Sequence, residues 1–291
     1  MATIEFDRSI PAAPAPAQSL RVDVSFHGRD ADDDTDLVTV EEPMEIRLGF
    51  TTEEGPTEQS ISVTMRTPGD DFDLAAGFLY TEGVIRSLAD IAQVEHCGPP
   101  SPDKGLRNVV KVTLAENVRF DAGSLMRHFF TSSSCGVCGK ASLDAVRIQL
   151  PDGKRDAFEI AAPELKRLPE ALRASQTEFV RTGGLHASAC FDASGGIRRL
   201  REDVGRHNAL DKLIGSYLEE SAPLAGLGIL LSGRASFELI QKAAMTRAAF
   251  VAAVGPPSSL AVELAGDLGL TLVGFLKADT FNVYVAPQRI V

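Results

Sequence analysis

Two cysteines separated by two residues are the part of this sequence best suited to covalent chemistry. Cys135 and Cys138 lie in the small-residue segment TSSSCGVCGK, residues 131–140, just before an apolar, helix-like run. The reactive form of cysteine is the thiolate, which a helix N-terminus or a nearby cation such as Lys140 stabilises. The two glycines of the segment let the backbone turn and leave the sulfurs accessible. The segment therefore predicts sulfur chemistry at Cys135 and Cys138.

Several kinds of chemistry use a Cys-x-x-Cys pair. A structural zinc site needs four ligands, usually two such pairs, whereas Cys97 and Cys190 are isolated in this sequence. A zinc deaminase needs H-x-E and P-C-x-x-C, but Ser134 precedes the first cysteine and Ser188 stands two residues after His186. A thioredoxin-like dithiol lacks the βαβ pattern that should surround it. A persulfide carrier remains, and a structural role is a weaker alternative because structural cysteines are usually buried among apolar residues.

Arg206 and His207 form a candidate anion site at the predicted start of a helix. They belong to the polar run EDVGRHN, residues 202–208, and helix N-termini bind anions through free backbone N–H groups. An ordinary solvated helix start is the alternative, and the crowding of polar residue types favours binding. The double glycine before His186 could admit a ligand, although a simple turn explains it equally well.

Three loops that follow predicted strands carry small polar residues and cations. They cover residues 232–236 (SGRAS), 255–259 (GPPSS) and 277–280 (KADT). In open α/β sheets, ligands bind at the carboxyl ends of the strands. Ser232 opens the first loop, Gly233 permits close backbone approach, and Arg234 can pair with phosphate. Arg234 stands where a nucleophile elbow has its serine, which excludes that motif. Together the loops predict one shared pocket.

Alternating apolar residues predict a β-rich first third of the chain. We expect strands over residues 21–27, 44–50, 60–66, 91–96 and 107–115, with a solvated acidic loop over 30–36. Asp70 or Asp71 is expected to cap a helix that runs to about Tyr80.

The predicted elements change near residue 120, from mainly strands to helices alternating with strands. We expect helices over residues 122–130, 163–175 and 207–218, and a hairpin of 185–191 and 197–201 around Ser194-Gly195-Gly196. Strands over 228–231, 251–254 and 270–275 then alternate with helices over 237–249 and 260–268. Continuous apolar strands separated by helices indicate a parallel sheet covered on both faces.

These patterns predict an α/β protein of two domains. We expect a flexible tail over residues 1–20, a β-rich α+β domain over 21–118, and an α/β domain over 119–291 that carries the Cys-x-x-Cys loop and the pocket.

Composition limits the function classes. The 29 basic and 40 acidic residues leave a net charge of −11, which argues against a nucleic-acid partner. No apolar run approaches the ~20 residues that span a bilayer, and the first 20 residues lack a signal-peptide core, so we expect a cytoplasmic protein with no membrane partner. Four cysteines do not make a disulfide framework.

Six segments together resemble the FdhD family of formate dehydrogenase accessory sulfurtransferases. In chain order they are AAGFLYTEGVI (75–85), TSSSCGVCGKAS (131–142), TGGLHA (182–187), EDVGRHNALDKLIG (202–215), SGRASFELIQKAA (232–244) and GFLKADTFNVY (274–284). The likeness spans most of residues 38–291.

The resemblance implies a function. Family members take persulfide sulfur from a cysteine desulfurase and pass it to the molybdenum (or tungsten) bis(molybdopterin guanine dinucleotide) cofactor, which enters the catalytic subunit of formate dehydrogenase. This implies that Cys135 carries the persulfide with Cys138 as its partner, and that the protein forms a homodimer. It also implies a cytidine-deaminase-like C-terminal fold with a mainly parallel sheet, without the zinc signature; the cofactor brings the metal, so no protein side chain need hold one.

The resemblance also implies the residues that contact the cofactor. The segment carried over from the family is Phe275, Leu276, Lys277, Ala278, Asp279 and Thr280. Arg-Gly is common in the family where this chain has Lys277-Ala278, a change that keeps the charge. The residues of the other candidate loops that we expect to contribute are Ser232, Gly233, Arg234, His186, Arg206 and His207. Two other functions remain open: a cofactor-binding chaperone without sulfur transfer, and a thiol-disulfide oxidoreductase.

Overall fold

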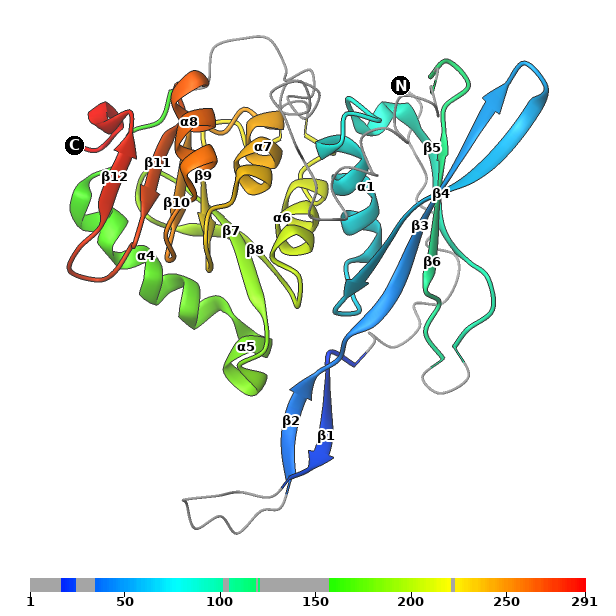
Figure 1. Ribbon diagram of the computed structural model, residues 1–291, viewed down its shortest axis with the longest axis horizontal. Helices are drawn as coiled ribbons and strands as arrows, with labels where there is room; N and C mark the ends of the chain where they lie inside the picture. Colours follow the sequence, from blue (N-terminus) through cyan, green and yellow to red (C-terminus); the bar gives the residue numbers. More distant parts are fainter. Residues whose placement is uncertain (1–16, 25–34, 102–104, 119, 121–156, 221–222) are drawn as a thin grey trace.

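The structure of the protein, a computed structural model, describes residues 17–24, 35–101, 105–118, 120, 157–220 and 223–291. Within these residues the strands form sheets of two, four and six strands, and helices pack on the larger two (Figure 1). The predicted helix over 122–130, the Cys-x-x-Cys loop and the helix expected after it lie outside the described residues, as does most of the predicted tail.

The four-stranded sheet has the order β4-β3-β6-β5. Its strands are β3 (Glu42–Thr52), β4 (Gly55–Arg66), β5 (Ile91–Cys97) and β6 (Val109–Leu114). The four predicted strands are confirmed, and in β3 the alternating residues Met44, Ile46 and Leu48 face the core and are fully buried. Side chains two residues apart lie on one face of a strand. In β4 the alternating residues Val63 and Met65 face outward instead and are 66% and 47% exposed.

Helix α1 (Asp71–Thr81) is also confirmed, but its predicted cap is wrong. Asp70 is the N-cap residue with φ 53° and makes no capping hydrogen bond. The Asp71 carboxylate instead accepts two hydrogen bonds of 2.9 Å from the buried guanidinium of Arg66. Burial of Arg66 requires a charged partner, and this requirement takes Asp71 away from capping.

Strands β1 (Ser19–Asp23) and β2 (Thr35–Thr39) pair as an antiparallel ribbon that extends away from the rest of the molecule (Figure 1). Two expectations are corrected here. Ser19 and Leu20, expected in a flexible tail, belong to β1, which ends earlier than the predicted strand over 21–27. Asp36, expected in the acidic loop, belongs to β2. Cross-strand hydrogen bonding, which a local polarity pattern does not report, decides both.

The six-stranded sheet has the order β12-β11-β10-β9-β7-β8. Its strands are β7 (His186–Phe191), β8 (Ile197–Asp203), β9 (Gly228–Leu231), β10 (Phe250–Ala253), β11 (Thr271–Gly274) and β12 (Asn282–Val285). The three strands predicted to be parallel, β9 to β11, are parallel. β7, β8 and β12 pair antiparallel, so the sheet as a whole is mixed rather than mainly parallel. Short connections, such as the predicted hairpin between β7 and β8, join antiparallel neighbours.

Helices cover both faces of this sheet, as predicted. They are α4 (Ala162–Ser175), α5 (Thr177–Thr182), α6 (Arg206–Gly215), α7 (Phe237–Met245) and α8 (Ser259–Asp267). One core contains Ile229 and Leu231 of β9 together with residues of α6, α7 and α8. The second core contains Leu230 with the apolar side of α4. Neighbouring strand residues point to opposite faces, which explains why these strands are apolar throughout.

The two larger sheets share one continuous core, which joins them across α1 and α6. A Cβ atom on Gly77 of α1 would lie 1.9 Å from the Asp211 carbonyl oxygen of α6, and one on Gly215 would lie 1.9 Å from the Asp73 carbonyl oxygen. The helices therefore cross in backbone contact at these two glycines. The predicted division into 21–118 and 119–291 falls beside residues outside the described ones and stays a prediction.

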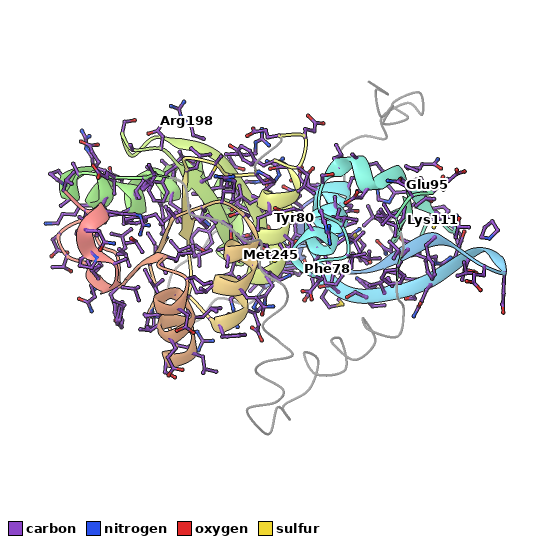
Figure 2. The ribbon with its side chains drawn as sticks, turned by 90° about the horizontal axis from the view of Figure 1, so that it is seen from above. Phe78, Tyr80, Glu95, Lys111, Arg198 and Met245 are labelled. Atoms are coloured by element: carbon purple, nitrogen blue, oxygen red, sulfur yellow. The ribbon has the colours of Figure 1, made fainter. Side chains whose placement is uncertain are left out.

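Polar contacts strengthen the same junction between the sheets. The Tyr80 hydroxyl of α1 donates to the Met245 carbonyl of α7 at 2.9 Å, and Figure 2 shows the two residues close together. The buried ammonium of Lys242 of α7 contacts Asp211 of α6 at 3.0 Å and Glu82, just after α1, at 3.1 Å. Charged and uncharged contacts thus connect α1, α6 and α7.

Candidate functional site

The three predicted strand-end loops lie side by side in the structure. The Gly255 N–H donates to the Gly233 carbonyl at 3.0 Å, and the Phe275 N–H donates to the Gly255 carbonyl at 3.1 Å. Ala235 and Pro257 form an additional parallel bridge. Because β9, β10 and β11 are neighbours and parallel, their carboxyl ends meet at one edge of the sheet. The three loops thus share one edge of the sheet, and the shared pocket expected from the sequence stays a prediction.

Glycine at position 255 is what allows the loops to approach so closely. A Cβ atom there would lie 2.8 Å from the Gly233 carbonyl oxygen and from the Arg234 nitrogen. Any larger residue would separate the first two loops, because neither contact is with a flexible side chain. The close approach of the first two loops therefore depends on the absence of a side chain at Gly255 and not on a polar contact.

The third loop presents most of its residues to solvent. Phe275 is 42% exposed and adopts a left-handed backbone with φ 51°, and the Lys277 N–H donates to the Thr280 carbonyl at 2.8 Å to close the turn. Leu276 differs from the expectation. Its side chain is fully buried in the second core, so it supports the loop from below and does not reach a ligand. The others, Lys277, Ala278, Asp279 and Thr280, are exposed.

Four predicted residues come together beside the first loop: His186, Arg206, His207 and Arg234. The group is called the cation cluster below, after its two arginines. The His186 ring, at the start of β7, lies against Gly233, where a Cβ atom would be 3.4 Å from Nδ1. Burial lowers the pKa of His186, and the positive charges of Arg206, His207 and Arg234 lower it further. The sequence places these residues up to 48 positions apart, and only the fold brings them together.

One carboxylate contacts the cation cluster. Glu238, in the first turn of α7, lies with Oε2 3.0 Å from Nε2 of His207. The hydrogen bond to His207 is the main reason that the pKa of Glu238 is lowered. The Nε of Arg206 is buried and has no hydrogen-bond partner among the described residues. Sequence reasoning missed Glu238, because it lies 31 positions from His207 and an exposed glutamate at a helix start is common.

A buried ion pair supports the turn that carries Arg206 and His207. Asp203 and Lys212 are both fully buried, with Nζ 2.8 Å from Oδ2. Asp203 also accepts hydrogen bonds from the backbone N–H of Thr67 and Gly205 and from the side-chain amide of Asn208. Some polar residues of this segment, which suggested binding in the sequence, thus support the fold instead. Asn208 and Lys212 are four residues apart and hence lie on one helix face. This spacing was the sequence signal that could have indicated their shared structural role.

The cysteines that the structure describes are poorly suited to nucleophilic chemistry. Cys190 is buried in β7 with its sulfur 3.1 Å from the Tyr217 hydroxyl, and Cys97 is half-buried at the end of β5. Burial raises the pKa of both thiols, which lowers the thiolate fraction. Cys135 and Cys138 lie outside the described residues, so their position relative to the cation cluster stays a prediction.

Neither a metal site nor a membrane span is found in the part of the chain that the structure describes. No group of three or more His, Cys, Asp or Glu side chains there could hold a metal ion. No helix in the same part is long and apolar enough to cross a membrane.

The chain is similar over most of its length to one group of proteins. The model of the FdhD/NarQ family matches residues 40–291. A protein named sulfur carrier protein FdhD from Streptomyces coelicolor is 48% identical over 88% of this chain and 89% of its own length. The protein of the same name from Mycobacterium tuberculosis is 46% identical over 88% of this chain and 92% of its own.

A solved structure supports the fold. A protein from Desulfotalea psychrophila, assigned as a formate dehydrogenase accessory protein, superposes with a TM-score of 0.69 and 24% identity, over 94% of this chain and 100% of that one. The family model covers all three strand-end loops and the Cys-x-x-Cys segment, and the two relatives are 48% and 46% identical over 88% of this chain. The chain therefore belongs to the FdhD/NarQ family.

Proposed function

We propose that this protein is a sulfur carrier that takes persulfide sulfur from a cysteine desulfurase and delivers it to the bis(molybdopterin guanine dinucleotide) cofactor destined for a formate dehydrogenase. The observation that carries the proposal is the family match over residues 40–291, which includes Cys135 and Cys138. The proposal extends to a cytoplasmic homodimer that serves a dehydrogenase catalytic subunit, for which the family resemblance is the support.

The sulfur steps balance without an external oxidant. The Cys135 thiolate attacks the outer sulfur of the desulfurase persulfide, so a new S–S bond forms on Cys135 while the desulfurase leaves as a thiolate. The Cys138 thiolate can then attack the inner sulfur of Cys135. This closes a Cys135–Cys138 disulfide and releases HS⁻ to the bound cofactor. The Cys138 thiolate supplies the electron pair of the new S–S bond, and HS⁻ leaves with the pair of the broken one. A cellular thiol then reduces the disulfide.

The described residues supply what a nucleotide-bearing substrate needs. Arg206, His207 and Arg234 offer positive charge for phosphates, and arginine binds phosphate through paired N–H donors. Lys277 adds a charge from the neighbouring loop. Exposed Phe275 offers a flat apolar surface on which a base can stack. The molybdenum or tungsten ion arrives as part of the substrate, and the protein need only hold the nucleotide ends.

The direct test of the proposal is the sulfur itself. The protein is incubated with a cysteine desulfurase and cysteine, and mass spectrometry then measures whether Cys135 has gained one sulfur atom. The metal–sulfur content and activity of formate dehydrogenase made with and without this protein complete the test. An unmodified Cys135 combined with normal cofactor binding would instead indicate a cofactor-binding chaperone, and turnover of generic disulfides would indicate an oxidoreductase.

We expect the protein to bind GDP at least tenfold more tightly than ADP, a difference of about 1.4 kcal/mol. A site that hydrogen-bonds the N–H groups of guanine is left with unpaired polar groups when adenine binds, which is costly. Isothermal titration calorimetry with the two nucleotides measures the ratio. Equal affinity for both, or binding of neither, contradicts a guanine nucleotide site at the strand-end loops.

Arg234→Ala is expected to weaken GDP binding about tenfold or more, because a charge-assisted hydrogen bond to phosphate contributes about 1.5–3 kcal/mol. Persulfide formation on Cys135 should be unchanged, since Arg234 is assigned to substrate binding alone. Arg198→Ala is the matched control. Arg198 is exposed and pairs with Asp192 at the far end of the β7–β8 hairpin from His186. An unchanged GDP affinity would remove Arg234 from the site, and loss of the persulfide as well would mean that binding and sulfur transfer are not separable.

A further inference from the structure

Glu238 occupies a position where an oxygen of an anionic ligand would be expected. Its Oε2 lies 3.0 Å from Nε2 of His207, and the Ser236 hydroxyl donates to the same oxygen at 3.4 Å. Arg206 is close enough to contribute to the lowered pKa of Glu238. These are donors of the kind that bind a phosphate oxygen, and a carboxylate of the protein now accepts from two of them.

The contact of Glu238 with His207 contributes little to the stability of the fold. The side chains of His207 and Glu238 are 35% and 52% exposed, and ion pairs this exposed contribute little to stability. The helix that carries Glu238 already has a cap, because the Ser236 hydroxyl accepts from the Leu239 N–H. The buried Asp203–Lys212 pair holds the neighbouring turn without Glu238. A glutamate in the first turn of a helix is favourable by its charge alone, but that effect does not require the contact of Glu238 with His207.

We propose that Glu238 is an internal competitor for the anion site. In the free protein its carboxylate contacts His207, and it moves away when a phosphate-bearing ligand binds. This inference rests on the proposed function, and it concerns which ligands that site accepts. A ligand must displace the carboxylate of Glu238 from His207 and replace it with its own negative charge. A singly charged anion gains little from the exchange, whereas a polyphosphate also reaches Arg206 and Arg234 and so gains contacts that Glu238 does not make. The site would therefore select diphosphates over simple anions.

The test uses the full chain with Glu238→Gln, which keeps the shape and removes the charge. Inorganic pyrophosphate and GDP are titrated by calorimetry. We expect both affinities to rise about fivefold, the scale of a half-exposed ion pair, and by the same factor, because the base does not take part. Glu263→Gln is the matched control, since Glu263 is exposed on the neighbouring helix α8 and should leave both affinities unchanged.

A double-mutant cycle shows whether Glu238 acts through His207. In a His207→Gln background, Glu238→Gln should raise pyrophosphate affinity by clearly less than in the wild type, since the contact that it breaks is already absent. An equal gain in both backgrounds would mean that Glu238 repels anions at a distance and does not occupy the site, which overturns the proposal.

The remaining outcomes separate this proposal from the proposed function. If GDP affinity falls in Glu238→Gln, the carboxylate contacts the ligand directly, for example the N–H groups of guanine, and the competitor role is wrong while the site stands. If Glu238→Gln leaves both affinities unchanged, the competitor role is likewise wrong and the site stands. If the wild-type protein binds neither pyrophosphate nor GDP, the nucleotide site itself is wrong, and the competitor role fails with it.

Discussion

Cys135→Ala is expected to abolish both persulfide formation on this chain and the production of active formate dehydrogenase in cells that carry only this variant. The thiolate of Cys135 is the proposed acceptor of sulfur, and alanine offers no nucleophile. The folded state should persist, because the segment 131–140 consists mainly of small residues and the substitution removes a single atom from it. Mass spectrometry after incubation with a desulfurase, together with dehydrogenase activity, measures both effects.

Cys97→Ala is the control for this variant. It removes a thiol from the end of β5 whose pKa is raised by burial, so both sulfur transfer and dehydrogenase activity should be retained. Cys138→Ala should have a milder effect if Cys138 only resolves the persulfide, because an external thiol can still release the sulfur. It should be as severe as Cys135→Ala if both thiols act together. Normal dehydrogenase activity with Cys135→Ala would falsify the sulfur-carrier assignment.

Gly77→Ala is expected to destabilise the protein by about 3 kcal/mol, the upper part of the range for overpacked sites. The added Cβ atom would lie 1.9 Å from the Asp211 carbonyl oxygen, which is backbone and cannot rotate away. Helices α1 and α6 would have to separate, and their separation would also disturb the contacts of Lys242 with Asp211 and Glu82. Thermal and chemical unfolding of the purified variant measure the loss.

Gly266→Ala on α8 is the matched control, because nothing lies within 4 Å of a Cβ atom built there. Alanine has the higher helix propensity at both positions, by about 1 kcal/mol, so Gly266→Ala should be neutral or stabilising. The difference between the two variants isolates the steric effect at the helix crossing. If Gly77→Ala is as stable as Gly266→Ala, the close contact of α1 with α6 is not what joins the two sheets.

Local patterns in the sequence predicted most of the regular structure. Alternation at Met44, Ile46 and Leu48 indicated a half-buried strand, and the apolar strand 228–231 indicated a sheet covered on both faces, because burial selects residue type directly. Strand β12 was missed for the same reason. Its residues are mostly exposed, so no apolar period marks it, and in the sheet it pairs with β11 at the edge.

The candidate site was predictable in its residue types and only partly in its roles. Arg234 and the two other strand-end loops were proposed because ligands bind at the carboxyl ends of strands in open α/β sheets. His207 was proposed because it lies at a predicted helix start. The buried position of Leu276 and the presence of Glu238 were not predictable. Both depend on which side of a loop or helix faces the core, and neither position has a local period that reports this.

The sequence by itself determined the family of this protein and the apolar periods that specify its helices and strands, and its Cys-x-x-Cys pair is the basis of the proposed sulfur chemistry. The tertiary structure alone decided which polar residues are scaffold and which are available to a ligand. Asp203 and Lys212 are fully buried as an ion pair, while His207, between them in the chain, stays partly exposed beside Glu238. Residue type sets what a side chain can do. Its neighbours, brought from distant parts of the chain by packing of the cores, set its burial, its charge environment and therefore its role.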